Sequence, residues 1–131
     1  MVSISIVGVG IDVLDISRME RLVTDEAFLT RVFTAEERAY IRARKKGSAA
    51  SAAGFFAAKE ALFKALGTGI TKSGLPSAGV THLESGQPVF CFSGELAETM
   101  NGLHVHLSIS HSDTVATALV VLERRDGNAP L

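Results

Sequence analysis

The sequence is poor in the features that would mark a secreted or membrane protein. It contains a single cysteine, Cys91, so no disulfide can form within the chain and a reducing, cytoplasmic setting is favoured. The N-terminal residues carry no basic leader and reach Asp12 after a short apolar run, so we expect neither a signal peptide nor a membrane span. The net charge of −1 indicates neither an acidic nor a basic partner.

No internal repeat, low-complexity tract or linker divides the 131 residues, so we expect one domain, at residues 1–126, followed by a flexible tail at 127–131. Hydrophobic residues make up 47% of the chain and charged residues 21%, which is typical of a compact globular protein. A chain of this length buries roughly two-thirds of its unfolded surface, so it needs no disulfide to fold.

Hydrophobic periodicity predicts strands at both ends of the chain and helices between them. Apolar residues alternate and then run together over residues 2–13, which indicates a largely buried first strand with Asp12 near its far end. Three shorter helices are expected next, over 16–23, 25–32 and 35–45, with Asp15, Thr24 and Thr34 as N-caps and Glu37 completing a capping box with Thr34.

The Ala-rich segment 48–66 is the strongest predicted helix, and Gly67 is placed to end it in the left-handed conformation. Gly54 inside this helix costs about 1 kcal/mol relative to Ala, so we expect another element to pack closely there. The rest of the chain predicts a hairpin over 80–92, a short helix after Ser93, and strands over 104–110 and 115–122. The expected fold class is α+β, with a mostly antiparallel sheet packed against a long central helix.

Glu60 and Lys64 lie one turn apart on the long helix, a spacing that also suits a solvated surface ion pair. Asp12 interrupts an apolar strand, where an acidic residue is costly unless it is paired, bound to a metal or capping the next turn. Asp12 and Glu60 could hold Mg²⁺, which commonly takes one or two protein carboxylates, and Lys64 and Lys59 could contact phosphates. Spacing alone leaves these alternatives open.

Two other motifs match known sites only in part. Gly8 and Gly10 could begin a dinucleotide-binding fingerprint, but the third glycine position of that motif is Val13. Ser110 and His111 suggest a serine hydrolase, yet adjacent residues on a strand point to opposite faces, so the pair would need a remote partner.

Three blocks of sequence carry a more specific resemblance. They are GID at 10–12, FAAKEALFKALGTG at 56–69 and SISHS at 108–112, and the middle block is the most specific of them. In order and spacing they resemble the holo-(acyl-carrier-protein) synthases, the short type of the 4′-phosphopantetheinyl transferase superfamily. The resemblance implies the fold of that superfamily and a role in fatty acid biosynthesis. The implied reaction is Mg²⁺-dependent transfer of 4′-phosphopantetheine from coenzyme A to a serine hydroxyl of apo acyl carrier protein, which releases adenosine 3′,5′-bisphosphate.

The resemblance also implies roles for single residues. Asp12 and Glu60 match the metal ligands of the family, Lys64 matches the lysine that contacts the pyrophosphate and assists transfer, and His111 matches the histidine near the nucleotide. The serine proton would pass to a metal-bound water or to Glu60. Leu14 stands where the longer, two-lobed transferases carry a third acidic ligand, so water is expected to fill that coordination position.

Arg18 matches a basic residue that docks the acidic carrier protein, and Arg21 lies one helical turn from it. The resemblance implies a homotrimer with active sites at the subunit interfaces.

Phe55 stands where many synthases have an arginine for the 3′-phosphate of coenzyme A, which leaves a binding module without catalysis as the alternative function. An acid-free basic stretch lies just upstream and could bind that phosphate or form a solvated surface; it comprises Arg38, Arg42, Arg44, Lys45 and Lys46. Aromatic residues are too few in this stretch for a nucleic-acid site.

Overall fold

The computed structural model describes residues 3–70 and 74–126 and contains two antiparallel sheets. In the larger sheet the strand order is β1–β5–β4, with β1 at Ser3–Asp15, β4 at Leu103–His111 and β5 at Val115–Asp126. The smaller sheet pairs β2 (Ala78–His82) with β3 (Pro88–Phe92). Every pairing is antiparallel, which confirms the predicted fold class.

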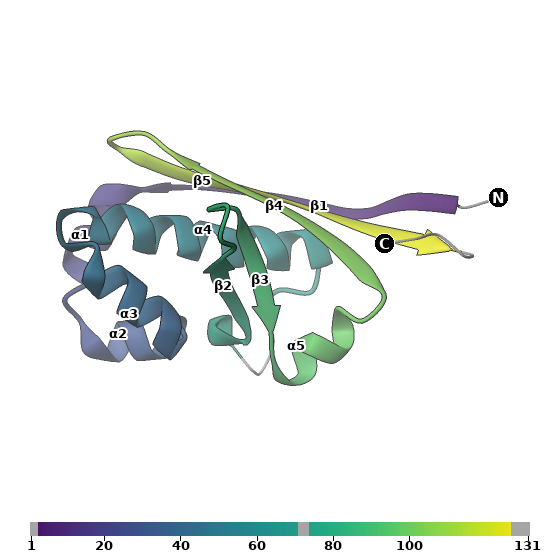
Figure 1. Cartoon of the computed structure of the whole chain (residues 1–131), viewed down its shortest axis with the longest axis horizontal. Coiled ribbons are helices and arrows are strands. Elements are labelled where there is room, and N and C mark those ends of the chain that lie inside the picture. The colour runs from purple at the N-terminus through teal and green to yellow at the C-terminus, as the bar shows by residue number, and fades with distance from the viewer. Residues whose placement is uncertain (1–2, 71–73, 127–131) are drawn as a thin grey trace.

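One long helix, α4 (Ser48–Leu66), lies lengthwise along the larger sheet (Figure 1). The other helices are α1 (Ile16–Leu22), α2 (Glu26–Val32), α3 (Ala35–Ala43), α5 (Gly94–Thr99) and the short 3₁₀ turns η1 (Lys45–Gly47) and η2 (Leu75–Ser77). Helices α1, α2 and α3 gather at one end of the molecule, and the β2–β3 hairpin crosses beside α4 (Figure 1). Among the described residues, no helix is long and apolar enough to cross a membrane.

The helix ends follow the capping signals with two exceptions, at α1 and α2. Asp15 occupies the N-cap position of α1, but its side chain makes no capping hydrogen bond. The Thr34 hydroxyl accepts the Glu37 N–H at 3.1 Å, and the Glu37 carboxylate accepts the Thr34 N–H at 2.8 Å, so the predicted capping box is confirmed. Gly67 ends α4 with φ of 73°, as predicted. Helix α2 is capped by the side chain of Asp25, not by Thr24, because the carboxylate of Asp25 accepts an N–H of the first turn.

Glycines set the distance between α4 and the larger sheet. A Cβ on Gly10 would lie 1.9 Å from the carbonyl oxygen of Ala61, and Gly8 comes nearly as close to the same helix. The pair that begins like a dinucleotide fingerprint is therefore a helix-packing surface. Gly54 has a similar role where α4 packs against β4 of the same sheet, because a Cβ there would lie 3.1 Å from a methyl group of Ile109. This confirms the predicted close packing.

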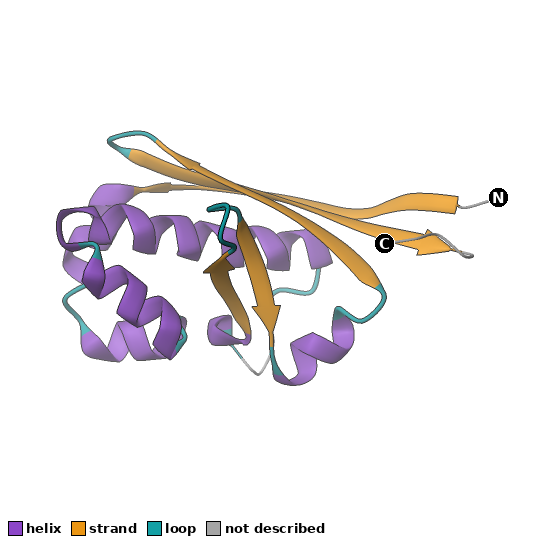
Figure 2. Ribbon diagram, viewed as in Figure 1, coloured by secondary structure: helices purple, strands orange, loops and turns teal. Residues whose placement is uncertain are grey.

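The prediction of a largely buried first strand is wrong for one of its two faces. Val9, Ile11 and Val13 point away from α4 and are 58%, 57% and 63% exposed. A register shift between Ile6 and Gly8 moves the earlier apolar residues to the same side. We call this surface the open sheet face; it comprises Ile4, Ile6, Val9, Ile11, Val13 and Leu119. In the described part of the chain all helices lie on the opposite side of the sheet (Figure 2).

Candidate active site

Strand β1 and helix α4 bring three of the predicted site residues together. Asp12 points to the same side of β1 as Gly10 and therefore faces α4. The Lys64 ammonium donates to the Asp12 carboxylate and to the carbonyl oxygen of Ile11, both at 3.0 Å. Asp12 is mostly covered, at 16% exposure, whereas half of the Lys64 side chain, 54%, remains in solvent.

Glu60 lies close enough to Asp12 and Lys64 for both charges to affect its pKa. Burial raises the pKa of Glu60, the Asp12 carboxylate raises it further, and the Lys64 ammonium opposes them. Two carboxylates therefore share one ammonium, and a divalent cation would neutralise the remaining negative charge. Hard carboxylate oxygens are the donors that Mg²⁺ prefers, so the residues present fit that ion.

Among the described residues, two carboxylates and no third ligand of the same kind lie here. Within 3–70 and 74–126 no three Asp, Glu, His or Cys side chains cluster as a metal site. Leu14, two residues beyond Asp12 on the same side of β1, is buried in the core and cannot coordinate an ion. Water and substrate oxygens would have to complete the coordination shell.

A hollow of about 230 Å³ opens beside these residues. It is lined by Glu60, Phe63 and Lys64 from α4 and by Gly67, Gly69 and Ile70 from the segment that follows. Glycines in this wall leave its backbone open to a ligand. A phosphate in the hollow would therefore meet the carboxylate and the ammonium together.

His111 lies on the other side of α4. It lines a pocket of about 210 Å³ that also contains Ser51 and Arg44, and this pocket shares no lining residue with the hollow beside Glu60. Ser51 and Glu60 are nine positions apart, and at roughly 100° per residue they project from opposite sides of the helix. A single chain thus presents two half-sites, one around Glu60 and one around His111.

Aromatic side chains fill the position expected for an arginine. Phe55 is 3% exposed, and its ring centroid lies 5.3 Å from that of Tyr40 and 5.8 Å from that of His82. The Arg44 guanidinium lies 5.4 Å from the centroid of Tyr40, which places a cation in the pocket. Sequence reasoning missed Tyr40 and His82, because only the tertiary fold brings α3 and β2 to Phe55.

The other cations predicted to bind a ligand or the carrier protein are exposed, and Lys46 lies beside His111. Lys46 lines a neighbouring hollow of about 350 Å³ together with His111 and residues of α1. Lys45 is exposed on η1, and Arg18 and Arg21 are exposed on α1. These side chains are accessible to a ligand or a partner.

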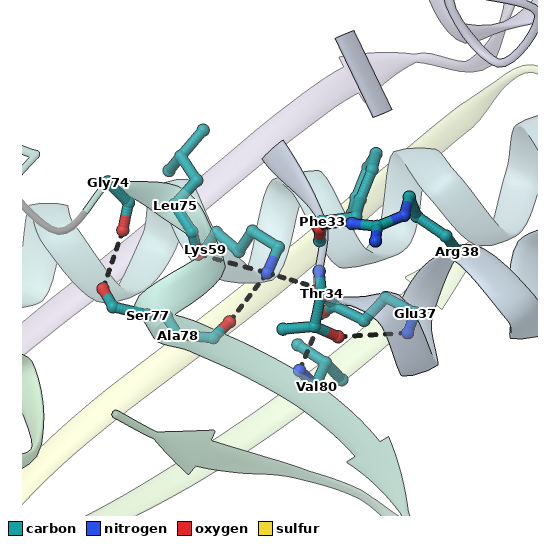
Figure 3. A network of polar contacts seen from close by, with 10 residues as sticks. All are labelled: Phe33, Thr34, Glu37, Arg38, Lys59, Gly74, Leu75, Ser77, Ala78 and Val80. Carbon is teal, nitrogen blue, oxygen red and sulfur yellow. Dashed lines mark hydrogen bonds and ion pairs between the residues drawn. The ribbon is translucent and has the colours of Figure 1, made fainter. Parts of the chain in front are cut away.

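The prediction that Lys59 contacts phosphates beside Lys64 is wrong. Lys59 is completely buried, and its ammonium lies 2.8 Å from the Glu37 carboxylate and donates to the carbonyl oxygens of Leu75 and Ala78 (Figure 3). Burial lowers the pKa of Lys59, and the charge of Glu37 opposes that shift. With its donors occupied inside the protein, Lys59 cannot reach a phosphate.

Known proteins resemble this chain over nearly its whole length. The family model of the 4′-phosphopantetheinyl transferase superfamily matches residues 8–120. The holo-[acyl-carrier-protein] synthase of Treponema denticola is 38% identical over 121 residues, which cover 90% of this chain and 98% of that protein. The synthase of Oceanobacillus iheyensis is 42% identical over 123 residues, which cover 92% and 99%.

Solved structures show the same likeness. The crystal structure of the synthase from Bacillus anthracis in complex with CoA (3′,5′-ADP) is 39% identical, with a TM-score of 0.78 over 91% of this chain and 97% of that one. The synthase from Neisseria meningitidis is 32% identical, with a TM-score of 0.81 over 90% and 98%. The chain therefore belongs to the 4′-phosphopantetheinyl transferase superfamily and, within it, to the holo-[acyl-carrier-protein] synthases.

Proposed function

We propose that Asp12, Glu60 and Lys64 carry out the reaction of this family in this protein. In that reaction 4′-phosphopantetheine passes from coenzyme A to a serine hydroxyl of apo acyl carrier protein, and adenosine 3′,5′-bisphosphate is released. The main support is that two carboxylates and one ammonium meet at the edge of an open hollow. A transferred phosphoryl group needs concentrated positive charge and an open approach for the acceptor. Lys64 and a divalent cation held by the two carboxylates would supply the charge, and the hollow offers the approach.

In the reaction the serine oxygen attacks the phosphorus atom that carries the pantetheine arm. The bond from that phosphorus to the bridging oxygen breaks, and the bridging oxygen leaves with the adenosine 3′,5′-bisphosphate. The proton of the serine hydroxyl passes to Glu60 or to a water molecule. Asp12 and Glu60 would hold Mg²⁺, which neutralises pyrophosphate charge when bound. Lys64 reaches the same oxygens as a point charge and stabilises the charge that develops on the leaving group.

The test is the mass of a purified apo carrier protein after incubation with the enzyme and coenzyme A. With Mg²⁺ we expect a gain of one 4′-phosphopantetheine group, and with a chelator in place of Mg²⁺ we expect none. A wild-type enzyme that leaves several different carrier proteins unmodified would overturn the assignment. Binding of coenzyme A that ignores both Mg²⁺ and Asp12→Asn in calorimetry would indicate a binding module instead.

We further propose that the protein works as a homotrimer whose active sites lie between subunits. Two observations support this assembly. The open sheet face carries apolar side chains that are 40% to 63% exposed in the single chain, and an apolar patch of this kind marks an interaction surface. The half-sites of Glu60 and His111 lie on opposite sides of α4, so a single coenzyme A can contact both most simply where two subunits meet.

Subunit mixing tests this arrangement. Glu60→Gln and His111→Ala homotrimers should each lose activity, because every interface carries one damaged half-site. In mixed trimers from equal co-expression, an interface is intact when both its halves are undamaged, so activity should recover to about a quarter of wild type. If both halves came from one chain, every site would carry one of the two lesions and no activity would return.

The carrier protein is proposed to dock on α1. Arg18 and Arg21 are exposed there, and their neighbours Ile16 and Glu20 line the hollow that also contains Lys46 and His111. Carrier proteins of this kind are acidic, so complementary charge would steer the serine toward this end of the site. We place the enzyme in the cytoplasm, where the exposed free thiol of Cys91 would stay reduced.

A further inference from the structure

The ion pair between Glu37 and Lys59 is unlike the others in 3–70 and 74–126, because both side chains are wholly excluded from solvent. The Lys59 ammonium makes three hydrogen bonds, at 2.8 Å to Glu37, 2.8 Å to the carbonyl oxygen of Ala78 and 3.2 Å to that of Leu75 (Figure 3). An ammonium has three protons, so its donor capacity is fully used.

The carboxylate of Glu37 is equally well satisfied. One oxygen accepts from Lys59 and from the Thr34 N–H, and the other accepts from the Val80 N–H at 2.8 Å. The network thus joins four elements, since it links the start of α3 to the middle of α4, to η2 and to β2 (Figure 3). Fully satisfied polar networks of this kind impose a single arrangement on the elements that they join.

Stability alone does not account for the pair. Replacing a buried ion pair by neutral residues of similar volume is often neutral or stabilising, because both charges lose their hydration. The pair is better explained by a role in orienting α4, because the buried surface of that helix is built mainly from small residues. These are Ala52, Ala53, Gly54, Ala57, Ala58, Ala61 and Ala65. Small side chains interlock little with neighbouring elements, so they do not by themselves fix the rotation of α4 about its axis. Hydrogen bonds are directional and fix that rotation.

The network also holds the chain at the point where it rejoins α4 after the hollow beside Glu60. The segment that lines this hollow begins with Gly67 at the end of α4, and the chain returns to the helix at Leu75 and Ala78. The carbonyl oxygens of both residues accept from Lys59, the immediate neighbour of Glu60. The position of Glu60 on α4 and the positions of Leu75 and Ala78 are therefore tied to one buried ammonium.

We propose that Lys59 is a positioning residue for the half-site around Glu60. Through its pair with Glu37 it holds the Glu60 carboxylate where that group can share a cation with Asp12, and it does not itself contact substrate. The inference rests on the proposed function, because it assumes that Asp12 and Glu60 bind the divalent ion. Mutation of residues that orient the metal ligands without contacting the metal typically changes metal affinity by about 10- to 100-fold.

The decisive variant is the double substitution Glu37→Gln/Lys59→Met. It removes both buried charges, keeps side chains of similar size, and leaves an amide oxygen that can accept from the Val80 N–H. The single variant Lys59→Met is less informative, because it leaves an unpaired buried carboxylate and should lose much of its stability. We expect the double variant to fold with a lower melting temperature, because the carbonyl oxygens of Leu75 and Ala78 lose their donor, and to need about tenfold more Mn²⁺ for half-saturation in a direct binding titration.

A matched control is Met19→Ala in α1, which removes a buried side chain outside the network. It should lower the melting temperature without changing the Mn²⁺ titration. The proposal is overturned if the folded double variant binds Mn²⁺ and transfers phosphopantetheine as the wild type does. Failure of the proposed function would look different, because the wild-type enzyme itself would then show no metal-dependent transfer.

Discussion

Replacing Glu60 by glutamine is expected to lower the rate of phosphopantetheine transfer by at least about 100-fold while the protein stays folded. The substitution keeps the size of the side chain and removes one of the two carboxylates that fit a divalent cation. A bound metal ion supplies several kcal/mol of transition-state stabilisation, and each 1.36 kcal/mol corresponds to roughly a tenfold change in rate. Initial rates from the mass shift of the carrier protein measure the effect.

The stability of the Glu60→Gln variant should move in the opposite direction to its activity. Burial and the Asp12 carboxylate raise the pKa of Glu60, so its ionised form is less stable in the fold than in the unfolded chain. The wild type should therefore lose stability as pH rises from the usual titration range of glutamate through the raised pKa, and Glu60→Gln should not. At neutral pH the variant should melt at the wild-type temperature or above it.

Added Mg²⁺ separates the two proteins further. Ligands that bind only the folded state raise the melting temperature, so Mg²⁺ should stabilise the wild type and leave Glu60→Gln almost unchanged. Glu26→Gln is a suitable control, because Glu26 forms an exposed ion pair with Arg42 on a different part of the surface. A Glu60→Gln enzyme with the rate of this control would exclude Glu60 as a metal ligand.

Gly10→Ala is expected to have the largest effect on folding, with a loss of several kcal/mol in the free energy of unfolding. The new Cβ would lie 1.9 Å from the Ala61 carbonyl oxygen and 2.8 Å from the Ala65 nitrogen, and both are backbone atoms of α4. Overpacking against side chains costs about 1–3 kcal/mol, and backbone atoms yield less readily. Denaturant unfolding, followed by circular dichroism, measures the loss.

The same substitution should also impair catalysis in whatever fraction of the protein folds. Asp12 lies two residues after Gly10, and Glu60 is adjacent to Ala61, so separating strand from helix moves the two carboxylates apart. Gly54→Ala is the matched control, because its Cβ would meet only a methyl group of Ile109, at 3.1 Å. Alanine also favours a helix interior over glycine by up to about 1 kcal/mol, so this variant should change stability little. Equal stability of the two variants would contradict the close approach of β1 and α4.

Local signals predicted most of the elements because their causes are local. The box between Thr34 and Glu37 and the left-handed Gly67 involve neighbouring backbone groups, so the sequence placed them within a residue or two. Alternation in β1 showed that Val9, Ile11 and Val13 share a face, but it did not show the register shift after Ile6 that brings the earlier apolar residues to the same face. It could not show what covers that face, because coverage depends on elements far along the chain or on other subunits. The burial predicted for Val9, Ile11 and Val13 was therefore wrong for the single chain.

The sequence alone determined that Glu60 and Lys64 share one side of a helix, because the spacing of residues along an α-helix is fixed by its hydrogen bonds. It could not assign the neighbouring Lys59, which lies about 100° further around the same helix. The tertiary structure directs Lys59 inward to Glu37 and leaves Glu60 at the edge beside Asp12, because the glycines of β1 and the buried network of Lys59 together set which side of α4 meets the sheet. The same packing places His111 on the opposite side of α4, a separation that no local spacing encodes.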